Sequence, residues 1–157
     1  MSHHGRAQCL VVRDGKILMV KHRVNGQEYY CLPGGGIEDN ESPDAAAIRE
    51  LQEECLVSGT IIKKTSEYPD PYGGAKMFYT YHIDIGDQTP SLGEDPEPQL
   101  RENPILIGVA WLALNEMSER DRGFLWSAGL ICIEQFSREL ESWSDDISYP
   151  DAWVTRF

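Results

Sequence analysis

The sequence predicts a single α/β (α+β) domain in which helices pack on a mixed β-sheet. Strand-like apolar segments and two helical segments follow one another in the order strands, helix, strands, helix, which favours this architecture. The length of 157 residues suits one domain. The 41% hydrophobic and 25% charged shares are those of an ordinary globular chain. We therefore expect residues 1–157 to form one domain, with tails at residues 1–6 and from about 145 to 157.

The first part of the chain predicts a hairpin and then a glycine-rich loop. Apolar residues 9–12 and 17–20 flank Asp14-Gly15, a pair typical of two-residue hairpin turns. A strand-like segment at residues 28–32 ends at Pro33, and three glycines follow at 34–36. Such a run favours a tight loop with exposed backbone over a continued strand.

A helix is predicted after this loop. Ser42 is a good N-cap, and Pro43 suits the first helical position. An apolar face at helical spacing follows, formed by Ala45, Ile48, Leu51 and Cys55. We expect Ser58-Gly59 to end this helix.

The second half of the chain predicts two strands, a long loop, a third strand and a helix. Residues 60–64 and 76–85 favour strands, with a loop at 68–74 between them. Residues 86–103 form an acidic loop, and the apolar run 105–112 predicts a buried strand. Residues 122 to about 143 predict one amphipathic helix, whose exposed apolar surface would be compatible with a homodimer.

The charge balance limits the class of partner. With 14 Lys and Arg against 26 Asp and Glu, the net charge of −12 repels polyanions and argues against a nucleic-acid polymer. No apolar run is long enough for a membrane span, so no membrane partner is expected. The polar N-terminus and the scattered cysteines, without a CxxC pair, favour a cytoplasmic protein with reduced thiols. A small phosphate ester could still bind through divalent cations.

Three carboxylates on the predicted helix could hold such cations. Glu50, Glu53 and Glu54 stand at positions i, i+3 and i+4, so they share a face, away from Ile48 and Leu51. Like charges at this spacing repel one another, and a bound divalent cation reverses that interaction. Oxygen ligands suit Mg²⁺ or Mn²⁺. Taken alone, an acidic helix face is more often simply solvated.

The surrounding spacing favours the metal site. Residues 35–57 carry Gly35, Glu41, Arg49-Glu50-Leu51, Glu53-Glu54 and Val57 at fixed intervals. This pattern resembles the Nudix hydrolase box, G-x5-E-x7-R-E-U-x-E-E-x-G-U, in which U is aliphatic. Leu56 stands where the family has glycine, and that glycine ends the helix in the family. We therefore expect the turn to shift to Gly59, which would lengthen the helix by up to a turn.

The resemblance implies an α/β/α sandwich with a mixed sheet and a loop-helix-loop site for Mg²⁺ or Mn²⁺. It implies hydrolysis of a phosphoanhydride bond in a nucleoside di- or triphosphate derivative, such as a nucleoside triphosphate or an oxidised nucleotide. By position, the metal ligands would be Glu50, Glu53, Glu54 and the Gly34 carbonyl. Glu53 or Glu50 would act as catalytic base, Arg49 would complete the catalytic group by orienting it, and Glu41 would also orient.

Several alternatives stay open. The base can also lie in the acidic loop, where Glu94, Asp95, Glu97 and Glu102 are candidates. Substrate contacts are expected at Tyr30, Tyr81, Trp111 and Asp121, although each residue also suits an ordinary packing or capping role. An ADP-sugar or dinucleotide pyrophosphatase is an alternative within the class. A non-catalytic Nudix-like ligand-binding regulatory domain is another, but the intact box carboxylates favour an enzyme.

Overall fold

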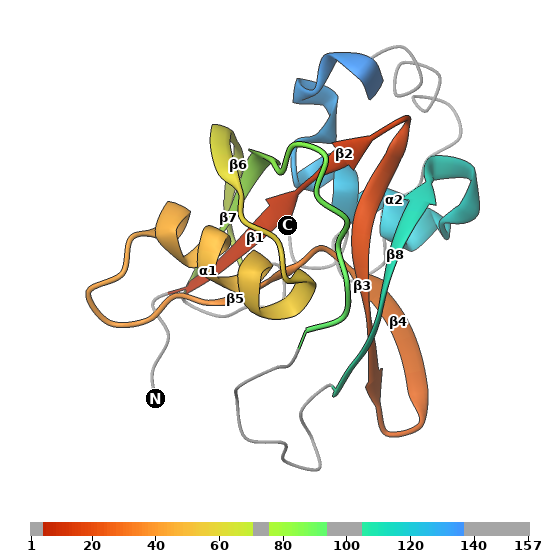
Figure 1. The fold of residues 1–157 in the computed structure, drawn as a ribbon, viewed down its shortest axis with the longest axis horizontal. Helices are drawn as coiled ribbons and strands as arrows, with labels where there is room; N and C mark the ends of the chain where they lie inside the picture. The colour runs from red at the N-terminus through yellow and green to blue at the C-terminus, as the bar shows by residue number, and fades with distance from the viewer. Residues whose placement is uncertain (1–4, 71–75, 94–104, 137–157) are drawn as a thin grey trace.

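The strands form two sheets in the computed structural model, which describes residues 5–70, 76–93 and 105–136 (Figure 1). The first sheet has the order β5-β1-β7-β6, and β1 and β7 run parallel while the other neighbours are antiparallel. Its strands are β1 (Gly5–Leu10), β5 (Gly34–Gly36), β6 (Thr60–Pro69) and β7 (Met77–Asp84). The second sheet is antiparallel and contains β2 (Val12–Arg13), β3 (Lys16–Val24), β4 (Gln27–Cys31) and β8 (Ile105–Ala113). The predicted mixed sheet is therefore confirmed in the first sheet, whereas the second sheet was not foreseen.

Two tight turns build the second sheet. The predicted turn at Asp14-Gly15 is confirmed, with φ angles of 51° and 74°, and it joins β2 to β3. Asn25-Gly26, with φ angles of 50° and 77°, makes a second turn of this kind between β3 and β4. This second turn was not predicted, although Asn-Gly is a strong hairpin indicator. This turn places Tyr29 and Cys31 beside β3.

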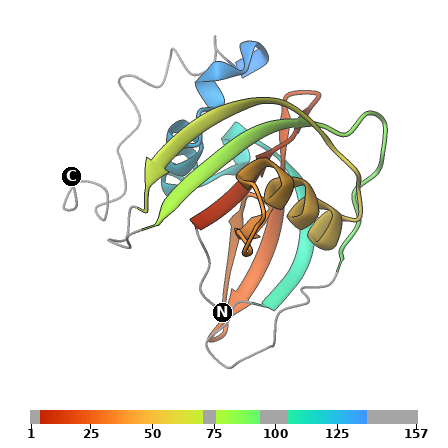
Figure 2. The same ribbon diagram turned by 90° about the vertical axis from the view of Figure 1, so that its left-hand side faces the viewer.

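The helices cover opposite faces of the strands, as expected for an α/β/α sandwich. Alternate residues of β3 show this, because Leu18 and Val20 belong to one hydrophobic cluster and Ile17 and Met19 to another. The first cluster includes Leu51 and other residues of α1 (Pro43–Cys55), and the second includes residues of α2 (Glu119–Ser127). Figure 2 shows α1 beneath the long, curved pair formed by β6 and β7.

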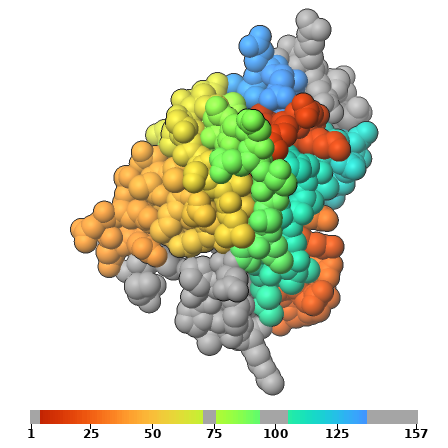
Figure 3. Space-filling model, viewed as in Figure 1, coloured from red at the N-terminus to blue at the C-terminus, as the bar shows by residue number. Residues whose placement is uncertain are grey.

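The predicted lengthening of α1 is wrong. The helix ends at Cys55, and Leu56 itself adopts the left-handed conformation (φ 56°, ψ 37°) while its N–H bonds to the Gln52 carbonyl. Two backbone bonds from the loop at 86–93 fix this end: Gly93 N–H to the Glu54 carbonyl at 2.9 Å and Ser91 N–H to the Cys55 carbonyl at 3.0 Å. The loop crosses the surface as the green segment beside α1 in Figure 3. Tertiary contacts therefore set the helix end without the family glycine.

Three further expectations need correction. The glycines at 34–36 form the short strand β5 rather than a loop, because they pair with β1. Tyr68 and Pro69 belong to β6 rather than to a loop, and residues 71–75 lie outside the described part of the chain. Strand β8 is mostly half-buried rather than buried: it pairs with β3 alone among the described strands, and Ile105 is 47% exposed.

The predicted continuous helix from residue 122 is also wrong. Helix α2 begins at Glu119, after the N-cap Ser118, and Gly129 (φ 89°) follows its end. Gly129 lies against the Thr65 backbone, where a Cβ would collide, so only glycine fits there. Residues 137–143 and the expected tail lie outside the described residues. Within the described residues, no helix is long and apolar enough to cross a membrane.

Candidate functional site

The site is built where α1 packs on β5. Ser42 caps the helix by accepting the Ala45 N–H, at 3.4 Å, as its sequence position predicts. Gly35 of β5 lies directly against the carboxylate of Glu50, so that any Cβ at position 35 would collide with it. The glycine run therefore brings strand backbone into contact with the acidic face of the helix.

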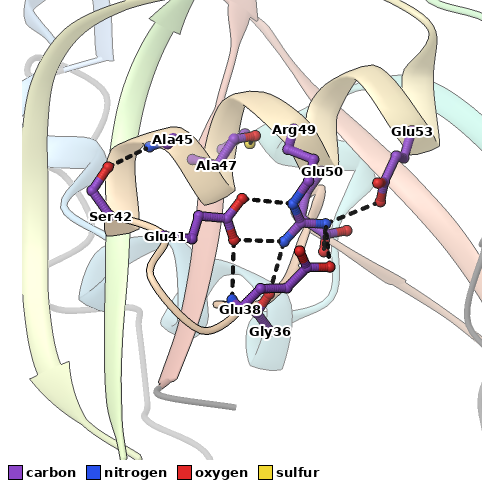
Figure 4. Close-up of polar contacts among 10 residues, drawn as sticks. Gly36, Glu38, Glu41, Ser42, Ala45, Ala47, Arg49, Glu50 and Glu53 are labelled. Atoms are coloured by element: carbon purple, nitrogen blue, oxygen red, sulfur yellow. Dashed lines mark hydrogen bonds and ion pairs between the residues drawn. The ribbon is translucent and has the colours of Figure 1, made fainter. Parts of the chain in front are cut away.

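Arg49 joins most of the acidic side chains (Figure 4). Its guanidinium makes a two-pronged contact with Glu41, through Nε at 2.7 Å and Nη2 at 2.9 Å. Nη1 donates to Glu50 at 2.9 Å and to Glu53 at 3.2 Å, and Nη2 also donates to the Gly36 carbonyl at 3.0 Å. Such a fork fixes the direction of each carboxylate. The orienting role expected for Arg49 and Glu41 in the reaction stays a prediction.

Glu50 and Glu54 are buried, although an acidic helix face is more often solvated. Their exposed fractions are 8% and 4%. Gly35 lies against the Glu50 carboxylate, and Gly34 and His22 lie against that of Glu54. Burial raises the pKa of Glu50 to about 7, although the Arg49 charge opposes the shift. By contrast, the hydrogen bond from Arg49 lowers the pKa of Glu41. Of these two carboxylates, which both bind Arg49, Glu41 therefore ionises readily, whereas Glu50 ionises only near neutral pH.

Glu54 contacts a different set of groups. Its Oε1 accepts the Gly34 N–H at 2.7 Å, and its Oε2 lies 3.8 Å from Nε2 of His22. His22 was not among the predicted site residues. Strand alternation could have found it, because His22 follows Leu18 and Val20 at every second position and so continues the buried face of β3. The expected role of the Gly34 carbonyl stays a prediction.

The donor set suits a divalent cation. Glu50, Glu53 and Glu54 offer only oxygen atoms, as Mg²⁺ and Mn²⁺ prefer. The missing Cβ of Gly35 allows the Glu50 carboxylate to lie directly against the strand backbone. Within the described parts of the chain, however, no three His, Cys, Asp or Glu side chains are already grouped as metal ligands. Arg49 instead bridges Glu50 and Glu53, so a cation would compete with its guanidinium.

The expected substrate contacts do not form one surface. Tyr81 is 8% exposed and lies in the cluster under α1, whereas Tyr30 packs against the cluster on the α2 side. The Trp111 ring lies 4.9 Å from the Arg13 guanidinium carbon. The Asp121 N–H bonds to Ser118, and burial raises the pKa of the Asp121 carboxyl. Their roles in binding stay predictions.

The alternative bases Glu94, Asp95, Glu97 and Glu102 lie outside the described residues. Gly93, the last described residue before them, lies beside the acidic helix, because its N–H bonds to the Glu54 carbonyl.

Comparisons with known proteins agree with this fold. The family profile described as "NUDIX domain" matches residues 3–132. Nudix hydrolase 25 of Arabidopsis thaliana is 44% identical over 63 residues, which are 40% of this chain and 34% of that protein. Phosphatase NudJ of Escherichia coli K12 is 38% identical over 55 residues, 35% of this chain and 36% of that protein. The matched region thus spans about a third of the length of these curated relatives.

A solved NUDIX hydrolase from Nitrosomonas europaea has the same fold, with a TM-score of 0.62, 20% identity and coverage of 88% of this chain and 90% of that one. The fold is therefore that of the Nudix hydrolases, and the match over residues 3–132 shows that the chain belongs to this family. Nudix hydrolases generally use divalent metal ions and act on small phosphorylated substrates.

Proposed function

We propose that this protein is a Mg²⁺- or Mn²⁺-dependent hydrolase that cleaves a phosphoanhydride bond in a nucleoside di- or triphosphate derivative. The observation that carries the proposal is the Arg49 fork, which binds Glu41, Glu50 and Glu53 and also the Gly36 carbonyl of β5. The box residues are thus oriented as a unit at the exit of the glycine strand.

Each residue has a separate task in this proposal. Glu50, Glu53 and Glu54, with the Gly34 carbonyl, would hold the cation. When bound, the cation supplies neutralisation of the phosphate charge and activation of the attacking water. Glu50 or Glu53 accepts the proton of that water. Arg49 keeps both carboxylates directed at the same place.

The substrate class rests on charge and on family membership. A net charge of −12 disfavours binding of a phosphate ester, and divalent cations at the carboxylates offset that repulsion. One relative is a mouse diphosphoinositol polyphosphate phosphohydrolase, and one structural neighbour is a UDP-X diphosphatase. Because the substrates in these names differ, the test panel contains nucleoside triphosphates, oxidised nucleotides, ADP-sugars, dinucleotides, UDP-linked compounds and diphosphoinositol polyphosphates.

The experiment measures phosphate and nucleoside monophosphate release from this panel, with and without Mg²⁺ or Mn²⁺. We expect turnover that requires the metal, and kcat lower by orders of magnitude in Glu53→Gln and Glu54→Gln. Glu67→Gln is the control, because Glu67 lies on β6 and pairs with Lys64 at the surface. If no member of the panel turns over with any divalent ion, the proposal is wrong and a ligand-binding domain is favoured.

A further inference from the structure

His22 occupies a position that neither the box nor the catalytic roles above explain. It is buried on β3, with an exposed fraction of 8%, and its ring stacks on Tyr29 with 5.7 Å between centroids. Its two ring nitrogens face different groups. Nδ1 lies 3.2 Å from the Cys31 Sγ, and Nε2 lies 3.8 Å from Oε2 of Glu54. Cys31, His22 and Glu54 therefore form a line that leads from β4 through β3 to α1.

We propose that His22 is a positioning residue for Glu54, and that the Cys31 thiol sets its tautomer by donating a hydrogen bond to Nδ1. A neutral imidazole that accepts at Nδ1 carries its hydrogen on Nε2, the nitrogen that faces Glu54. The inference rests on the proposed function, because it assigns to Glu54 a partner that prepares it for a cation.

The chemistry of Cys31 supports this direction of donation. Burial raises the pKa of its thiol to about 12. The sulfur therefore keeps its proton at neutral pH and is available as a donor rather than as a thiolate acceptor. The register of the β3–β4 hairpin brings Cys31 and His22 together. Val20 lies opposite Cys31 and His22 lies opposite Tyr29, so Cys31 and His22 are diagonal neighbours on adjacent strands.

The two oxygens of Glu54 face different groups. Oε1 accepts the Gly34 N–H at 2.7 Å, and Oε2 faces Nε2 of His22 at 3.8 Å. Arg49, by contrast, orients Glu50 and Glu53. The separation of 3.8 Å is longer than a hydrogen bond, so a neutral ring acts on the carboxylate through the dipole of its N–H. The effect is therefore a preferred orientation of the carboxylate.

The first test reads the tautomer directly in the metal-free protein. Long-range ¹H–¹⁵N correlation spectra at pH 8 distinguish the two neutral tautomers and the imidazolium, and the His22 signals are assigned by their absence in His22→Gln. We expect the Nε2–H tautomer in the wild type and in Cys31→Ser, which keeps a donor. We expect a mixture in Cys31→Ala. A wild-type ring with hydrogen on Nδ1, or on both nitrogens, would overturn the proposal.

The second test measures the affinity for Mn²⁺ by electron paramagnetic resonance, in variants whose folding is checked by circular dichroism. A lost outer partner of a metal ligand typically weakens binding about 10- to 100-fold, and we expect this loss in His22→Leu. His22→Gln keeps an N–H near the place of Nε2 and should recover most of the affinity. Equal affinity in His22→Leu and wild type, or an equal loss in both variants, contradicts the positioning role.

These outcomes separate the inference from the proposed function. A wild-type protein that binds no Mn²⁺ contradicts the proposed function. A wild-type protein that binds Mn²⁺ no better than His22→Leu contradicts the inference alone. Absence of nucleotide turnover, together with the expected tautomer and affinities, removes the proposed reaction and leaves the role of His22 intact.

Discussion

The end of helix α1 allows a sharp test of how this chain replaces the box glycine. Leu56 adopts a left-handed conformation (φ 56°, ψ 37°) and is 51% exposed. The conformation disfavours any residue with a Cβ. We therefore compare Leu56→Gly with Leu56→Ala, because both variants lose the same side-chain contacts and differ in the Cβ. We expect the glycine variant to be the more stable of the two.

The expected difference follows from two opposing terms. A left-handed conformation costs a residue with a Cβ about 1–2 kcal/mol. Glycine loses more backbone entropy on folding, which offsets about 0.5–1 kcal/mol of that gain. The glycine variant should thus exceed the alanine variant by about 0.5–1 kcal/mol in free energy of unfolding. For a chain of this size that is a shift of the melting midpoint by about 1–4 °C.

The matched control is Gln52, one turn earlier on the exposed side of the same helix. There the order reverses, because glycine in a helix interior is about 1 kcal/mol less favourable than alanine. Urea unfolding of the four variants measures both differences. If alanine is the more stable residue at both positions, then residue 56 is not left-handed in solution and our account of the helix end is wrong.

Three further predictions concern the acidic site in metal-free protein. Because burial raises the pKa of Glu50 from 4.5 to about 7, its contribution is fully present below pH 4.5 and is lost as pH rises through 7. The loss is at most about 3 kcal/mol, so Glu50→Gln should be more stable than wild type at pH 8 and similar at pH 4.5 in urea titrations. Gly35→Ala should cost about 1–3 kcal/mol, because its Cβ would strike the Glu50 carboxylate. Arg49→Lys should cost about 1–2 kcal/mol, measured by urea unfolding, because lysine cannot reproduce the two-pronged contact.

Each of these predictions has a control and a contradicting outcome. A stability difference between Glu50→Gln and wild type that does not change with pH would show that Glu50 is not held in a poorly solvated place. Gly108→Ala should be tolerated, because its Cβ would meet Lys21 at an ordinary 3.5 Å, and equal losses at both glycines would refute the close approach. Arg23→Lys changes an exposed pair with Glu28 and should have little effect. A similar small effect at Arg49 would contradict the orienting fork.

The local sequence was sufficient for features that depend on neighbouring residues. The Asp14-Gly15 turn and the Ser42-Pro43 helix start follow from backbone preferences within a few residues. The spacing of Glu50, Glu53 and Glu54 on one face of the helix follows from helical periodicity. These residues also carried the resemblance that the family match confirms.

Features that depend on distant contacts needed the tertiary structure. Leu56 ends the helix because Ser91 and Gly93 bond to its last carbonyl groups, and no local pattern encodes a partner nearly forty residues away. Strand β8 is only half-buried because of its edge place in the second sheet, although its apolar run resembles that of a buried strand.

The sequence by itself determined which side chains are the candidates for the chemistry, because residue type and helical spacing are local properties. The tertiary structure decided their environment: Glu50 and Glu54 are buried, Arg49 bridges the carboxylates, and His22 and Cys31 lie behind Glu54. The physical reason is that the burial of these carboxylates depends on residues of β3 and β5 that lie against α1. Only long-range packing brings these segments together.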